Sequence, residues 1–188
     1  MISTYFQLGL THILDIQGYD HMLFLLLLLA GLRIQQWKEL IGLITAFTFG
    51  HSVILAIVTL YEPLLSSNLV EFLIPITILI TGMNNLMHHN SNIRFKLALT
   101  LCFGLIHGMG FASYLSALMS QNSNIWEPLL YFNLGVEAGQ IIFVSVIVGL
   151  ATFLPFMSKN TIHKTQNIIS ILGVAISIFL AASNWPFL

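Results

Sequence analysis

The feature that most restricts the fold of this chain is a series of long apolar runs separated by short polar segments. Only 7% of the 188 residues are charged, 57% are hydrophobic, and the mean hydropathy is +0.90. A water-soluble domain usually carries about 25% charged residues. The chain therefore has too little polar surface for a soluble globule, and we predict a single all-α transmembrane domain over residues 1–188.

Six of the apolar runs are predicted to cross the bilayer as helices. They cover residues 19–32, 40–61, 70–87, 97–119, 129–157 and 167–187. The first run is short for a hydrocarbon core of about 30 Å, so it must extend into the residues before it. Residues 1–17 are more polar, and we interpret them as an interfacial or re-entrant segment, with a separate span as the alternative.

The positive charges predict the orientation of these spans. Every Lys and Arg falls in the first, third or fifth predicted loop: Arg33, Lys38, Arg94, Lys96, Lys159 and Lys164. The positive-inside rule makes these loops cytoplasmic and places both termini on the other side of the membrane. The net charge of −1 offers no basic surface for nucleic acid, and a single cysteine excludes an internal disulfide.

Ionisable side chains lie in the middle of four of the predicted spans. They are Asp20, His21, His51, His107 and Glu137. The helical rise places each of them roughly 12–20 Å from an edge of its span, so they share nearly one depth. A charge in hydrocarbon must be neutralised, paired or coordinated. Imidazoles with carboxylates suit a divalent ion of borderline hardness, so we predict an intramembrane site for nickel, with zinc or cobalt as alternatives.

Further polar residues on the same helical faces predict neighbours of this site and a path away from it. They are Ser52, Asn133, Gln140, Asn84 and His88. The last two lead toward the predicted cytoplasmic side and are interpreted as an exit route, with a solvated loop histidine as the alternative for His88. Glu71, near the other end of the same span, is either an interfacial residue or a group on the access side.

Four ordered motifs then connect the chain with a known family. They are His12 followed by Gly18-Tyr19-Asp20-His21, then Thr48-Phe49-Gly50-His51-Ser52, then Phe103-Gly104-Leu105-Ile106-His107-Gly108, and then Phe132-Asn133-Leu134-Gly135-Val136-Glu137. They resemble the motifs of the HupE/UreJ family of small membrane proteins, which is associated with nickel supply to hydrogenase and urease. The resemblance implies a nickel permease or accessory protein in the bacterial inner membrane.

The resemblance also implies metal ligands. It assigns His12, Asp20 and His21 to the family's first motif, His51 to the second and Glu137 to the fifth span. The family usually has five residues between the first histidine and the aspartate, whereas this chain has seven, which indicates a divergent branch. Two more residues rotate His12 by roughly 200° on a continuous helix. His12 is therefore either presented from a break near residues 17–18 or is not a ligand.

Three functions fit these residues. We favour a permease for a divalent metal ion, most of all nickel, whose uptake falls as the pH drops and protons compete for the imidazoles. The second is an intramembrane zinc-dependent hydrolase with Glu137 or Asp20 as general base. The third is a non-catalytic accessory subunit whose histidines only join helices. The expected partners are the lipid bilayer and the metal ion, and both a monomer and a homo-oligomer fit the sequence.

Overall fold

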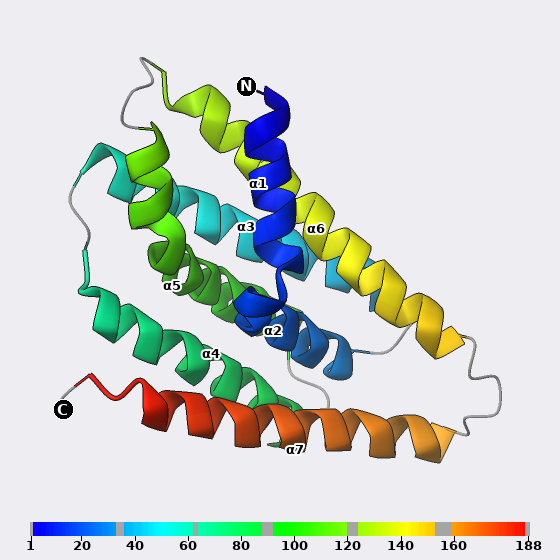
Figure 1. Ribbon diagram of the computed structural model, residues 1–188. Helices are drawn as coiled ribbons and strands as arrows, with labels where there is room; N and C mark the ends of the chain where they lie inside the picture. Colours follow the sequence, from blue (N-terminus) through cyan, green and yellow to red (C-terminus); the bar gives the residue numbers. More distant parts are fainter. Residues whose placement is uncertain are drawn as a thin grey trace.

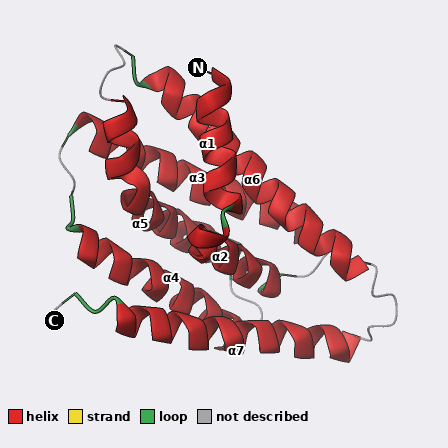
Figure 2. Cartoon of the chain, viewed as in Figure 1, coloured by secondary structure: helices red, strands yellow, loops and turns green. Residues whose placement is uncertain are grey.

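A computed structural model shows a bundle of α-helices, with no strand among the residues that it describes (Figures 1 and 2). These residues are 2–32, 36–61, 64–87, 92–119, 124–152 and 159–186. The α-helices of this part of the chain are α1 Ile2–Leu14, α2 Tyr19–Ala30, α3 Trp37–Leu60, α4 Ser67–Met87, α5 Ile93–Met119, α6 Trp126–Thr152 and α7 Lys159–Ser183. A short 3-10 turn, η1 Ile16–Gly18, stands between α1 and α2.

Five of these helices, α3 to α7, are long and apolar enough to cross a membrane. The helices α1 and α2 pass the same test as a pair, bent by 67° at η1, and so form a broken sixth span or a re-entrant segment. The predicted all-α membrane fold is confirmed. The break falls at residues 15–18 because Gly18 is a poor helix former, and its amide bonds back to the Asp15 carbonyl at 3.0 Å.

Several helices begin earlier than the predicted spans. The helix α5 starts at Ile93 and not at residue 97, and α7 starts at Lys159 and not at residue 167. Hydropathy marks where a chain becomes apolar, whereas a helix continues as long as its backbone hydrogen bonds do. Lys96, predicted to lie in a loop, is therefore a helical residue with a fixed position in the bundle.

The bundle consists of three helix pairs around the short helix α2. The helices α3 and α5 pair in the middle of Figure 1, α1 crosses α6 at the upper edge, and α4 lies beside α7 at the lower edge. Half of the residues of α2 are buried, among them His21, Phe24 and Leu27. The helix contacts α1, α4, α6 and α7, so α2 is the central element of the bundle.

Glycines permit unusually close contact between α3 and α5. A Cβ atom at Gly104 would collide with the carbonyl oxygen of Phe47, and one at Gly50 would collide with that of Leu101. Each glycine thus faces the carbonyl group three residues before the opposing glycine. Apolar side chains gain little by leaving lipid, so membrane helices associate by such backbone-to-backbone packing.

The pair α1 and α6 repeats this contact in the same register. Gly9 faces the carbonyl oxygen of Phe132, and Gly135 faces that of Phe6. In both pairs, later residues of one helix contact later residues of the other, so the paired helices are parallel. Close contact at two facing glycines therefore fixes two of the three helix pairs.

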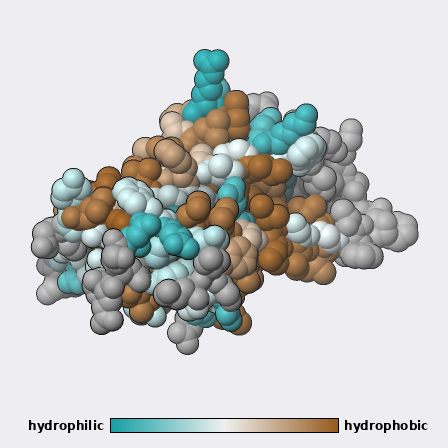
Figure 3. All heavy atoms as spheres, turned by 90° about the horizontal axis from the view of Figure 1, so that it is seen from above, coloured by the Kyte–Doolittle hydropathy of each residue, from teal (hydrophilic) through white to brown (hydrophobic). Residues whose placement is uncertain are grey.

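The surface of the bundle is apolar. On α7, Ile171, Leu172 and Phe179 are 55%, 57% and 69% exposed. Figure 3 shows hydrophobic residues, in brown, over much of the face seen from above. Such an extended apolar surface requires lipid around it.

We predict that Gly104→Ala destabilises the protein by about 1–3 kcal/mol, because the added methyl group must push α3 and α5 apart. Gly149→Ala is the control, since a Cβ atom there would meet nothing within 4 Å. Alanine also raises helix propensity by up to about 1 kcal/mol, so the control should be neutral or stabilising. Thermal unfolding in detergent measures both variants, and equal midpoints would contradict the close contact.

Candidate functional site

Four histidines from four helices meet in the interior of the bundle. The imidazole of His21 on α2 lies 4.6 Å from that of His12 on α1, 6.1 Å from that of His51 on α3 and 5.3 Å from that of His107 on α5, measured between ring centroids. His21, His51 and His107 are each at most 4% exposed. We call these four residues the histidine cluster.

The glycine contacts and the helix break explain why these residues meet. His51 directly follows Gly50, and His107 directly precedes Gly108, whose added Cβ atom would lie 2.9 Å from the His51 carbonyl oxygen. The bend of 67° between α1 and α2 brings His12, near the end of α1, within 4.6 Å of His21 at the start of α2, between ring centroids. His12 therefore joins the cluster through the break, which was the first of the two predicted arrangements.

Hydrogen bonds fix the orientation of two of the rings. The carboxylate of Asp20 lies 3.1 Å from Nδ1 of His21, and the carbonyl oxygen of Phe103 lies 2.9 Å from Nδ1 of His107. A carbonyl oxygen can only accept, so Nδ1 of His107 carries the proton and Nε2 keeps a free lone pair. The carboxylate favours the same tautomer of His21. Carboxylates and carbonyl groups hold metal-binding histidines in this way.

The cluster contains buried imidazole nitrogens that have no hydrogen-bond partner among the described residues. They are Nε2 of His12, His21 and His107, and both nitrogens of His51. Leaving a buried polar group unpaired costs about 1–3 kcal/mol. Five such groups would cost a large part of the 5–15 kcal/mol by which a domain is usually stable. The donor chemistry therefore fits a ligand that accepts electron pairs from neutral imidazoles.

The rings do not converge on one point as they stand. Within the part of the chain that the structure describes, no group of three His, Cys, Asp or Glu side chains is arranged to hold a metal ion. Ring planes within the cluster meet at angles of 52° to 67°. Coordination of one ion by several of these rings would require them to rotate about their side-chain bonds.

Glu137 lies away from the cluster and joins α6 to α3. Its Oε1 accepts a hydrogen bond of 2.7 Å from Thr45, and Gln140 accepts one of 2.8 Å from Thr48. Thr45 precedes His51 by six residues, or roughly 9 Å along the helix. Of the two predicted carboxylates, Asp20 is the one with a bond to the cluster.

Two other predicted neighbours bond within their own helices. The hydroxyl group of Ser52 donates to the carbonyl oxygen of Thr48 at 2.7 Å, and the amide of Asn133 donates to that of Leu129 at 2.8 Å. Neither of these bonds reaches a histidine. The bonds accommodate the polar side chains of Ser52 and Asn133 within the apolar bundle.

A pocket of about 410 Å³ leads to one side of the cluster. We call it the outer pocket, because it lies toward the end of the bundle where α4 begins and α7 ends. Its polar lining residues are His12, Tyr19, Asp20, His21, Glu71, His107 and Asn184. The side-chain amide of Asn184 donates to the backbone oxygen of Glu71 at 3.2 Å and so connects α7 with α4. Glu71 thus shares a pocket with the histidines.

An aromatic layer closes the other side of the cluster. The ring of Phe24 lies 5.0 Å from that of Phe47 and 6.1 Å from that of Phe103, between centroids. His107 packs 5.6 Å from Phe24 and 5.2 Å from Phe47. The layer was not predicted, because the sequence does not show that phenylalanines from three different helices meet.

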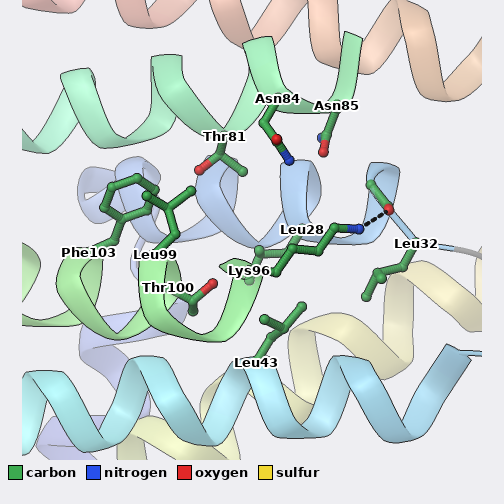
Figure 4. A pocket seen from close by; sticks show the side chains of 11 residues that line it. Leu28, Leu32, Leu43, Thr81, Asn84, Asn85, Lys96, Leu99, Thr100 and Phe103 are labelled. Atoms are coloured by element: carbon green, nitrogen blue, oxygen red, sulfur yellow. Dashed lines mark hydrogen bonds between the residues drawn. The ribbon is translucent and has the colours of Figure 1, made fainter. Parts of the chain in front are cut away.

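Beyond this layer lies a much smaller space of about 20 Å³, which we call the inner pocket (Figure 4). Its polar lining residues are Thr81, Asn84, Asn85, Lys96 and Thr100. Asn84 thus lines a pocket on the predicted exit side, whereas His88 lies outside the described residues. Lys96 was predicted only as a loop charge, and its place at this pocket is new.

A family model described as HupE / UreJ protein matches residues 1–187. The chain belongs to the HupE/UreJ family. Proteins of this family are known as nickel/cobalt transport or accessory proteins. The family and the apolar helices together make the chain an integral membrane protein. Searches among curated proteins and among solved structures found no significant match.

We predict that His21 and His107 carry their proton on Nδ1 in the metal-free protein at neutral pH. Nitrogen NMR of protein with isotope-labelled histidine measures this, with the variants His21→Gln and His107→Gln assigning the signals. His163, which is exposed on α7, provides a histidine signal outside the cluster for comparison. A proton on Nε2 of His107 would contradict the hydrogen bond to Phe103.

Proposed function

We propose that this HupE/UreJ protein is a permease for divalent metal ions of borderline hardness, with nickel as the expected substrate and cobalt or zinc as alternatives. The observation that carries the proposal is the histidine cluster, whose unpaired imidazole nitrogens lie beside the outer pocket. Family membership supports it independently. The proposed location is the inner membrane of a bacterium, with the outer pocket away from the cytoplasm.

The ion binds as the transported substrate. It loses part of its hydration shell in the outer pocket and takes neutral imidazoles in exchange, which suit nickel, cobalt and zinc better than calcium or magnesium. Asp20 holds the His21 ring and supplies a negative charge that offsets part of the cost of dehydration. The ion then passes the aromatic layer toward the inner pocket.

The zinc hydrolase stays an alternative prediction, and one observation makes it less favourable. Its general base must reach a metal-bound water, yet Glu137 is bonded to Thr45, roughly 9 Å along α3 from His51. Asp20 would have to act as the base while it also holds His21. A permease needs no such base.

The first test is the metal content of purified protein after loading with nickel. Wild-type protein should retain an equimolar amount, and His51→Ala and His107→Ala should lose most of it, because each removes a buried imidazole. His163→Ala is the matched control, since it removes an exposed histidine. Equal metal content in wild type and in both cluster variants would disprove the site. Metal that exchanges rapidly supports transport, whereas metal retained through chelator treatment supports the hydrolase.

The outer pocket predicts a second result. Glu71→Gln should raise the KM for nickel uptake at least about threefold and leave the maximal rate unchanged, because the carboxylate concentrates cations at the pocket but does not move with them. Glu127→Gln changes the charge equally and near the same end of the bundle, at the start of α6, but does not line the pocket. Uptake by cells at several nickel concentrations measures both variants. If Glu71→Gln had the same KM as the wild-type protein, Glu71 would have no part in the pathway.

A further inference from the structure

The carbonyl end of α2 is held by side chains from three other helices. Nζ of Lys96 on α5 donates to the oxygen of Gly31 at 3.2 Å. Asn85 on α4 donates to the oxygen of Leu27 at 2.7 Å, and Gln166 on α7 donates to that of Leu32 at 2.9 Å. A helix ends with unpaired carbonyl groups and a partial negative charge, so this end attracts cations.

Lys96 places a full positive charge at this end. Figure 4 shows its side chain crossing the inner pocket from α5, with its nitrogen turned toward the end of α2. Among the described residues that line the pocket, Lys96 is the charged one. The carboxylate of Glu39 is near enough to interact with Lys96, but Glu39 is not among these lining residues. The described lining of the inner pocket therefore carries a positive side chain.

The helix α2 leads from the histidine cluster at its start to Lys96, which contacts its end. His21, Phe24, Leu28 and Gly31 follow one another on α2 at spacings of three or four residues, so they share a face. From His21 to Gly31 the helix rises roughly 15 Å. A metal ion that leaves the cluster along α2 first meets the aromatic layer and then the ammonium group of Lys96.

We propose that Lys96 is the inner gate of the cation pathway. Its ammonium group occupies the carbonyl oxygen at the end of α2. The ammonium group repels a divalent cation until the lysine side chain moves away from Gly31. The gate rests on the proposed permease function and deepens it, because it assigns the control of passage to a residue outside the histidine cluster. Cation passage requires either displacement of the lysine side chain or loss of its charge.

The test measures the entry of Co²⁺ and Ni²⁺ into proteoliposomes that contain a dye quenched by these ions. Lys96→Met removes the charge and keeps most of the length of the side chain. Gln166→Leu is the matched control, because it removes a neighbouring hydrogen bond to the end of α2 without changing the charge, and Gln166 is not among the described residues that line the inner pocket. Lys96→Arg keeps the charge, and Lys96→Gln is a second neutral variant in case Lys96→Met does not fold.

The neutral lysine variants should raise the initial rate of ion entry about tenfold, which corresponds to a barrier lower by about 1.4 kcal/mol. Gln166→Leu and Lys96→Arg should stay near the wild-type rate. If Gln166→Leu accelerates entry as much as Lys96→Met does, the lysine only secures the helix end and the gate is disproved. An unchanged or slower rate in both neutral variants disproves it as well.

Nickel retention by the same preparations separates the gate from the permease. Lys96→Met should keep the wild-type nickel content, because the histidine cluster lies on the other side of the aromatic layer. Failure of the wild-type protein to bind or move nickel would count against the permease. Intact binding and transport with an unchanged rate in Lys96→Met would count against the gate alone.

Discussion

The close backbone contact between parallel helices is the constraint on which the rest of this structure depends. In lipid, side-chain hydrophobicity does not hold helices together, so the helices depend on close contact at glycines for their association. Gly50 and Gly104 bring α3 and α5 together, and Gly9 and Gly135 do the same for α1 and α6. These contacts leave the neighbouring histidines directed into the shared interior, so the same glycines that make the fold also assemble the cluster.

The two sides of the cluster differ, and this asymmetry gives the bundle a direction. A wide pocket with Asp20 and Glu71 lies on one side, whereas three phenylalanine rings and a narrow pocket with Lys96 lie on the other. Negative groups attract a cation on the first side, and a positive group repels it on the second. Such an arrangement fits the proposed permease, with one side open and the other closed.

Much of the cluster could be predicted from the sequence, because ionisable residues in an apolar run are rare and conspicuous. Asp20, His21, His51 and His107 stood out for that reason, and the structure brings all four together. Glu137 stood out equally, but the structure pairs it with Thr45, because the rotation of α6 turns this residue toward α3. Hydropathy gives the depth of a residue and not the neighbour that it faces. The place of Lys96 at the inner pocket was hidden, since a lysine at a span end normally marks only orientation.

The sequence by itself determined the class of fold and the family, because both depend on the order and composition of local segments. Tertiary structure alone decided which residues meet. The bend at η1 placed His12 beside His21, and helix rotation separated Glu137 from the cluster. Packing against α2 assigned Lys96 to the inner pocket. Each of these outcomes depends on contacts between segments distant in the chain, which no local pattern encodes.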